Sequence, residues 1–208
     1  MTSPLAWLQL GGPVMAVLAI MSVAVVTLSI IKLWEFSEQR LSSREFVDRS
    51  LQAWEGGQGD QALVALADSP SPLAAVLRDA IRILQDARLS PGHARERIER
   101  LGVEALQKAR THLRTLDLIG GLAPLVGLLG TVLGMIEAFQ ALQAAGDRVE
   151  PSILSGGIWQ ALLTTAVGLG IAIPTVALAS YFERRVEALQ QAMESALTRL
   201  LTLPRVTG

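Results

Sequence analysis

The sequence predicts an all-α membrane protein with three transmembrane helices, of which the second and third extend into a helical region outside the bilayer. Two observations support this fold class. Half of the 208 residues are hydrophobic and only 18% are charged, whereas an ordinary soluble domain carries about 25% charged residues. The apolar residues also cluster into three long uncharged stretches, and about 20 such residues are enough for one helix to cross a bilayer.

The first uncharged stretch covers residues 5–31. The first basic residue, Lys32, follows this stretch, whereas a cleavable signal peptide begins with basic residues. We therefore expect a retained helix and assign residues 1–34 to the N-terminus and the first transmembrane helix. Trp7 and Trp34 bracket it, as expected for aromatic rings at headgroup level.

The second and third stretches hold nineteen uncharged residues, Leu118–Ile136, and thirty-two, Pro151–Phe182. They predict transmembrane helices over residues 116–143 and 158–183, joined by a loop over residues 144–157. Because this connection is short, we expect the two helices to run antiparallel.

The segment between the first two spans, residues 35–115, is expected to be a helical domain. Glycine and proline place breaks at Gly56–Gly59, Ser69–Pro72 and Ser90–Gly92. Ser90 and Pro91 suit the N-cap and first position of the following helix. A further helix is expected over residues 184–208.

Apolar residues at a spacing of three and four predict one buried face on each of two helices in this domain. The first face comprises Leu73, Val76, Leu77, Ala80, Ile81 and Leu84, and the second comprises Ile98, Leu101, Ala105, Ala109, Leu113 and Leu116. Because only Gly102 interrupts the run from Ala94 into the second span, we expect one continuous helix there.

Basic residues predict the orientation. Thirteen Lys and Arg residues lie between Lys32 and Thr115, four follow Phe182, and only Arg148 lies between the last two spans. Basic residues favour the cytoplasmic side. We therefore expect a periplasmic N-terminus, a periplasmic 144–157 loop, a cytoplasmic helical domain and a cytoplasmic C-terminus.

Composition argues against several kinds of function. The chain has no cysteine, and its net charge is −1, so thiolate metal sites, thiol catalysis and general attraction to nucleic acid are not indicated. His93 and His112 lie among charged residues and are expected on solvated helix surfaces. We expect no metal, no cofactor and no enzymatic activity, since no nucleophile–base pair is apparent.

The second span carries a small-residue face made of Gly127, Gly130 and Gly134. Small residues at this spacing allow membrane helices to approach closely, so these glycines are expected to pack. Thr131 lies beside them, and Glu137 follows the end of the uncharged stretch.

The third span carries a narrow polar stripe, because Gln160, Thr164 and Gly168 follow one another at intervals of four residues and Thr165 borders them. Thr131 and Thr165 are each seventeen residues from Arg148, so they are expected at similar depth, facing each other. The threonines would line a polar pathway if several copies assembled. Alternatively, their hydroxyls bond back to carbonyls of their own helices.

Each of the last two spans contains a run of motif residues. In the second span these are Ala123-Pro124, Val126-Gly127-Leu128, Gly130-Thr131-Val132 and Gly134. In the third span they are Gly157-Ile158, Ala161-Leu162, Thr165-Ala166, Gly168-Leu169 and Ile173-Pro174. These two runs resemble the MotA/TolQ/ExbB proton channel family, and three spans favour its ExbB/TolQ branch over the four-span MotA branch.

The resemblance implies a homopentamer in the inner membrane of a Gram-negative bacterium. It also implies a single-span partner of the ExbD/TolR type, whose aspartate carries protons, and a TonB- or TolA-like protein that receives the resulting motion. Carried over by position, Thr131 and Thr165 are the pore-lining hydroxyls near that aspartate. From the polar stripe we expect Gln160 and Thr164 to line the same pathway. Pro124, Pro174 and the glycines are expected at helix-packing positions, with membrane lipid around the assembly.

One position departs from the family. ExbB-type members commonly have glutamate where this chain has Gln160, so either that carboxylate is dispensable or Glu137 takes over part of its role. The resemblance favours an ExbB-like function in TonB-dependent transport. A TolQ-like role in Tol–Pal envelope maintenance, a non-transporting scaffold and a small-solute permease are the alternatives.

Overall fold

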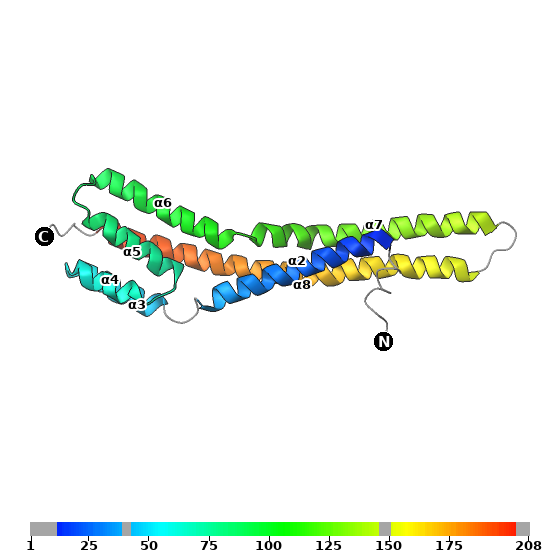
Figure 1. Ribbon diagram of the computed structural model, residues 1–208, viewed down its shortest axis with the longest axis horizontal. Helices are drawn as coiled ribbons and strands as arrows, with labels where there is room; N and C mark the ends of the chain where they lie inside the picture. Colours follow the sequence, from blue (N-terminus) through cyan, green and yellow to red (C-terminus); the bar gives the residue numbers. More distant parts are fainter. Residues whose placement is uncertain (1–11, 39–42, 146–150, 203–208) are drawn as a thin grey trace. The chain divides into compact units, whose positions relative to one another are not determined.

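The computed structural model describes residues 12–38, 43–145 and 151–202, and every regular element within these ranges is an α-helix. The helices, shown in Figure 1, are α2 (Gly12–Glu38), α3 (Ser43–Glu55), α4 (Gly59–Ala67), α5 (Pro72–Gln85), α6 (Pro91–Arg110), α7 (Leu113–Ala145) and α8 (Pro151–Thr202). Trp7 and Arg148, which served as sequence landmarks, lie outside the described residues.

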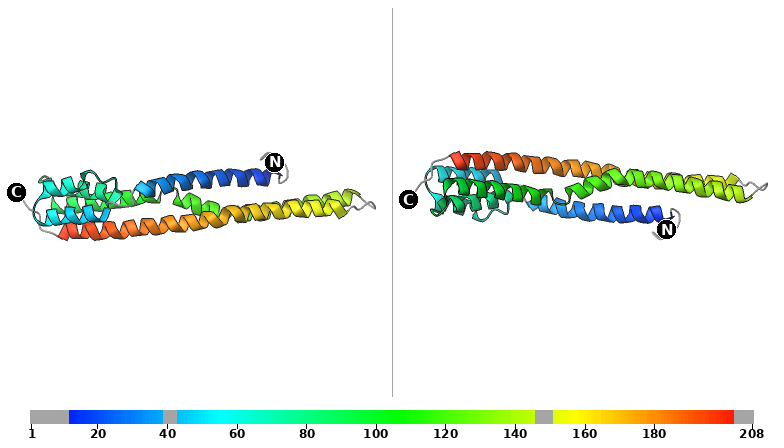
Figure 2. Two further views of the ribbon diagram at one scale, coloured as in Figure 1. Left: turned by 90° about the horizontal axis from the view of Figure 1, so that it is seen from below. Right: turned by 90° about the horizontal axis from the view of Figure 1, so that it is seen from above.

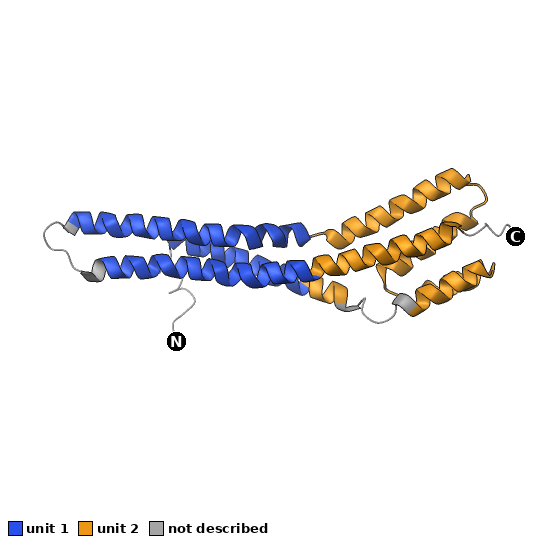
Figure 3. Cartoon of the chain, turned by 180° about the vertical axis from the view of Figure 1, so that it is seen from behind, with its two compact units in different colours: residues 1–30, 112–181 blue, residues 31–111, 182–208 orange. Residues whose placement is uncertain are grey.

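The chain divides into two compact units (Figure 3). Residues 1–30 and 112–181 form the first, and residues 31–111 and 182–208 form the second. Among the described residues, three segments are long and apolar enough to cross a membrane, beginning at Gly12, Pro91 and Leu154. The expected all-α architecture with three membrane helices is therefore confirmed.

The first unit consists of most of α2, all of α7 and the first part of α8. Helices α7 and α8 lie side by side in Figure 1 and in both views of Figure 2. The packing of α2 onto this pair buries Val14, Met15, Leu18, Ala123 and Ala172. Many large apolar side chains on the three helices stay exposed, such as Ile20, Leu125 and Ile173 at 71%, 59% and 68%. Such a surface suits lipid or another membrane helix rather than water.

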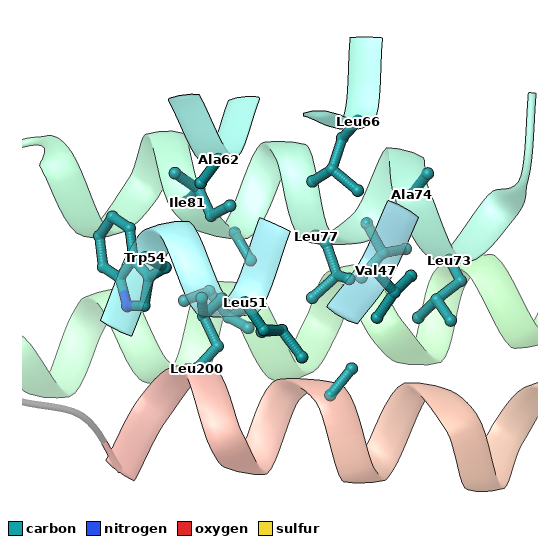
Figure 4. Close-up of a cluster of buried hydrophobic side chains, with 14 of the residues drawn as sticks. Val47, Leu51, Trp54, Ala62, Leu66, Leu73, Ala74, Leu77, Ile81 and Leu200 are labelled. Carbon is teal, nitrogen blue, oxygen red and sulfur yellow. The ribbon is translucent and has the colours of Figure 1, made fainter. Parts of the chain in front are cut away.

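The second unit packs α3, α4, α5, α6 and the last part of α8 around one apolar core (Figure 4). Leu51, Leu66, Leu77, Ile81 and Leu200 are each at most 1% exposed. The predicted apolar face of α5 is buried here, with only Leu84 partly accessible. On α6, Ile98 and Ala109 are buried, while Leu101 and Ala105 are partly buried.

The helix ends in this unit follow the sequence signals, and all three predicted breaks are confirmed. The Ser90 side chain caps α6 by accepting a hydrogen bond from the His93 backbone N–H, and Pro91 opens the helix. Gly57 follows α3 with φ of 75°, a left-handed conformation that glycine adopts without steric cost.

The prediction of one continuous helix from Ala94 into the second span is wrong. Helix α6 ends at Arg110 and α7 begins at Leu113. Thr111 between them has an extended ψ of 138°, and His112 has φ of 70°. By contrast, α8 is continuous over 52 residues, as expected for the third span and its extension.

The expected 144–157 loop is also shorter in the structure. Helix α7 reaches Ala145 and α8 begins at Pro151, so helix replaces loop at both ends of the predicted segment.

Candidate functional site

The contact between α7 and α8 is a seam in which backbone meets backbone. A Cβ atom added to Gly127 would lie 2.9 Å from the Thr164 carbonyl oxygen and 3.1 Å from the Thr165 Cα. A Cβ atom added to Gly168 would lie 2.6 Å from the Ala123 carbonyl oxygen. Farther along, Gly134 lies against Ala161. Only glycine permits this approach, which matches the packing interpretation of the glycine face.

Thr164 lies inside this seam. Its residue is 2% exposed, and its hydroxyl donates toward the carbonyl oxygens of Ala161 at 2.7 Å and Gly127 at 3.1 Å. Its side chain also fills the space beside Gly130, where a Cβ atom would lie 2.7 Å from the Thr164 Cβ. The structure therefore places Thr164 between the two helices of one chain and not on an open polar face.

Thr131 and Thr165 lie at the edge of the seam and are partly exposed. The Thr165 hydroxyl donates across the seam to the Gly127 carbonyl oxygen at 3.1 Å, and the Thr131 hydroxyl donates to the Leu128 carbonyl oxygen at 2.6 Å. The two acceptors are consecutive residues of α7. This geometry places both hydroxyls at the same level of the helix pair, in agreement with the depth expected from their spacing.

The two interpretations of the threonines thus apply to different residues. Thr131 bonds back to its own helix, Thr165 bonds to the neighbouring helix, and Thr164 does both. A threonine hydroxyl has one proton to donate and two lone pairs that accept. Because the protons are engaged with carbonyls, the oxygens of Thr131 and Thr165 remain as acceptors at a partly accessible edge.

Gln160 and Glu137 lie near one end of the same seam. Gly157 packs against Ala138, and Gly134 packs against Ala161, so both residues fall within one turn of this pair of contacts. Gln160 is partly exposed and Glu137 is exposed. Gln160 therefore lies level with the end of the uncharged stretch of α7.

Both prolines named from the sequence lie inside helices, Pro124 in α7 and Pro174 in α8. A proline has no N–H, so the carbonyl one turn earlier, at Gly120 or Gly170, loses its usual partner. Pro124 directly follows Ala123, whose carbonyl meets Gly168. The missing backbone hydrogen bond therefore lies within a turn of one of the close contacts between the two helices.

Sequence reasoning missed a buried lysine. Lys32 of α2 is 1% exposed, and its Nζ lies 2.8 Å from Glu35 Oε2 and 3.0 Å from the Ala109 carbonyl oxygen. The Phe36 ring centroid is 5.6 Å from Nζ, and Phe36 stacks on Phe182 of α8 with ring centroids 5.7 Å apart.

This cluster joins three helices of the second unit. A positive charge at the C-terminal end of α6 also complements that helix's dipole. In the sequence, Lys32 directly follows the apolar stretch, and Glu35 and Phe36 lie three and four residues farther on. This spacing was the signal from which the cluster could have been predicted.

Residues 68–195, more than half of the chain, match the MotA/TolQ/ExbB proton channel family. The chain belongs to this family. The match includes all of α7 and the seam-forming part of α8, so it contains each of the seam residues described above, whereas Lys32 and Glu35 lie outside it. It also extends beyond the two motifs from which the resemblance was first inferred.

Individual relatives carry both ExbB and TolQ names. A stretch of 65 residues is 52% identical to biopolymer transport protein exbB1 of Vibrio cholerae, covering 31% of this chain and 28% of that protein. The putative biopolymer transport protein ExbB homolog of Methanothermobacter thermautotrophicus is 29% identical over 148 residues, covering 71% of this chain and 51% of that protein.

The Tol-Pal system protein TolQ of Haemophilus influenzae is 33% identical over 101 residues, covering 49% of this chain and 42% of that protein. The chain thus spans about half or less of the length of these three relatives. Within the family it is ExbB-like.

Proposed function

We propose that the chain is the channel-forming subunit of a proton-driven motor that acts on a TonB-dependent transport system or a related envelope process. The observation that carries this proposal is the pair of hydroxyls at the edge of the α7–α8 seam, Thr131 and Thr165, which lie at one depth. Family membership supports the same role. The role is transport rather than catalysis.

The titrating acid belongs to another chain. Residues 118–136 and 151–182 contain no ionisable side chain except Tyr181 near the end of the second range. Proton transfer within a membrane needs titratable groups, and these are costly enough in lipid to mark function. A single-span partner of the ExbD/TolR type, with an aspartate in its span, supplies what this chain lacks.

The hydrogen bonds that the two hydroxyls already make determine which protonation state of that aspartate they stabilise. With their protons engaged by α7 carbonyls, Thr131 and Thr165 accept a hydrogen bond from a protonated carboxyl group but do not donate to a carboxylate. Hydrogen bonding to the neutral form of an acid favours that form. The seam therefore holds the protonated aspartate, and a hydroxyl must rotate before it stabilises the charged one.

Thr131→Val and Thr165→Val test this role. Each variant keeps the shape of the side chain and loses the hydroxyl, so we expect assembly with the partner and loss of proton-driven uptake. Thr→Ser at either position keeps the hydroxyl and retains activity. Thr27→Val is the matched control, because the Thr27 hydroxyl bonds only to Val23 of its own helix at 2.8 Å. Normal energised uptake by both valine variants would refute the proposal.

The proposed assembly is a pentamer around the partner's spans, in the inner membrane of a Gram-negative bacterium. The N-terminus and the connection between α7 and α8 face the periplasm, and the second unit faces the cytoplasm. The distribution of basic residues supports this orientation. Because the chain has no cysteine, single cysteines at Ala144 and Ser195 report it cleanly: an impermeant maleimide added to intact cells with a permeabilised outer membrane labels only the first.

A TolQ-like role in the Tol–Pal system is the second candidate, supported by the similarity to the TolQ protein of Haemophilus influenzae. Complementation separates the two roles: restored TonB-dependent uptake supports the ExbB-like role, and restored outer-membrane integrity supports the other. A chain that purifies without a partner bearing an acidic residue in its span would instead be a scaffold.

A further inference from the structure

A cavity of about 620 Å³ opens on the surface of the second unit. It lies where α5, α6 and the end of α2 meet, and it is separate from the α7–α8 seam. Its lining combines Ala75, Val76, Leu101, Ala105 and Ala109 with Pro70, Pro72, Glu35, Asp79, Glu104 and Lys108. A cavity of this volume accommodates several side chains.

The charges around this groove are unbalanced. The Glu35 carboxylate is neutralised by the buried Lys32, which leaves the carboxylates of Asp79 and Glu104 against the single ammonium group of Lys108 in the lining. Asp79 and Glu104 are 52% and 57% exposed, so they face solvent and are accessible to a second molecule.

The partners of these two carboxylates are also accessible. Arg82 and Arg100 are 63% and 77% exposed and do not line the groove. Exposed pairs of this kind are weak, so they yield readily to a cation that enters together with apolar side chains.

The walls of the groove are held in place. Pro70 and Pro72 fix the backbone of the α4–α5 connection. Two other lining residues, Glu35 and Ala109, hold the buried Lys32 ammonium through the Glu35 carboxylate and the Ala109 carbonyl oxygen. A groove built on fixed walls loses little conformational freedom when it binds.

We propose that this groove binds a basic amphipathic segment of a partner protein, with apolar side chains on the alanine-rich floor and Lys or Arg side chains against Asp79 and Glu104. The charge complementarity selects this occupant over an acidic or neutral one. The mode is a helix or short segment laid into a groove by one apolar face.

The test uses the full-length chain in nanodiscs of zwitterionic lipid and two fluorescent peptides. Both peptides share one leucine face, and their other positions are Lys in one and Glu in the other. We expect saturable binding of the Lys peptide, at least about tenfold tighter than that of the Glu peptide, and weakening with salt.

Variants of the groove residues test whether the peptide binds in this groove. Asp79→Asn/Glu104→Gln is expected to weaken Lys-peptide binding about tenfold, since it removes two exposed charge contacts. Ala105→Phe should block the floor without altering charge. Glu96→Gln/Glu187→Gln changes net charge equally on exposed helix positions outside the groove and should leave affinity within about twofold.

Three results would overturn the proposal: no saturable binding of the Lys peptide, equal binding of both peptides, or equal effects of the groove and control pairs. Occupation by a second copy of the chain is detected separately. If a single cysteine at Ala75, modified through its thiol with a photoactivatable cross-linker, joins two copies without any peptide present, this result overturns the assignment to a partner protein.

Discussion

The buried Lys32–Glu35 pair gives a sharp energetic prediction, because its two members are buried to different extents. The Lys32 side chain is 1% exposed, whereas the Glu35 side chain is 35% exposed. Glu35→Gln leaves a buried ammonium group without a counter-charge, held by the Ala109 carbonyl, the Phe36 ring and at most a neutral amide oxygen. Removing one partner of a buried ion pair costs about 3–5 kcal/mol of folding free energy. Because the remaining contacts still stabilise the ammonium group, we expect a loss of about 3 kcal/mol.

Lys32→Met should cost less. It leaves the Ala109 carbonyl without its lysine donor, which costs about 1–3 kcal/mol. It also loses the contact with Phe36, about 0.5–1 kcal/mol or more. Glu35 returns to water at little cost, because it is already partly exposed. The methionine fills the space of the lysine stem without a buried charge, so we expect a net loss of about 2 kcal/mol.

The assay is the free energy of unfolding of each variant, measured by SDS titration in mixed micelles with far-UV circular dichroism. The double variant Lys32→Met/Glu35→Gln should resemble Lys32→Met alone, because no uncompensated charge remains. Its coupling energy should therefore be about 3 kcal/mol. Additive effects of the two substitutions, or a smaller loss for Glu35→Gln than for Lys32→Met, would refute a buried, paired lysine.

Substitutions at three further places test the seam, the break between α6 and α7, and Glu137. Gly127→Ala places a Cβ atom 2.9 Å from the Thr164 carbonyl oxygen and should destabilise the α7–α8 pair by about 1–3 kcal/mol. Gly121→Ala is the control: its Cβ atom would have no atom within 4 Å, so it should not lower thermal stability. His112 has a left-handed backbone conformation, which glycine adopts without steric strain but with a larger loss of entropy on folding. His112→Gly should therefore raise the free energy of unfolding by about 0.5–1 kcal/mol, and His112→Val should lower it. If Glu137 replaces the carboxylate that is missing at position 160, Glu137→Gln should reduce proton flux, measured with a pH dye in proteoliposomes. Adding Gln160→Glu to this variant should restore the flux. Unchanged flux in Glu137→Gln would exclude that role.

The three spans and most helix boundaries were predictable because they depend on local chemistry. Uncharged length identifies a membrane helix regardless of its neighbours. Proline and glycine pairs, together with the Ser90 cap, mark ends that the structure reproduces. The apolar face of α5 was likewise visible from spacing, since one amphipathic helix needs one buried face.

The interruption between α6 and α7 was not predictable in this way. Thr111 and His112 carry no strong helix-breaking signal, and the stabilising contact near the break comes from Lys32, 77 residues away from Ala109. A residue that far along the chain leaves no periodic trace at the site it stabilises. The same reason explains why the burial of Lys32 was missed, since a basic residue after an apolar stretch is usually expected at the membrane surface.

The polar stripe of the third span shows how far spacing alone determines a site. Thr164 and Thr165 are adjacent, so their side chains point about 100° apart on the helix. Thr164 shares its face with Gly168 and lies in the seam, whereas Thr165 reaches its edge and remains partly accessible. The glycine one turn from Thr164 was the available signal for the packed face.

This division assigns different duties to neighbouring hydroxyls. Thr164 is held by two carbonyls and fixes the spacing of the helix pair, so Thr164→Val should lower stability before it alters transport. Thr131 and Thr165 retain acceptor sites on the accessible edge, and in the proposed function these are the positions where a partner's protonated acid would be stabilised. The proposed proton-driven cycle would then require hydroxyl rotation at these two edge positions, while the seam behind them keeps its packing.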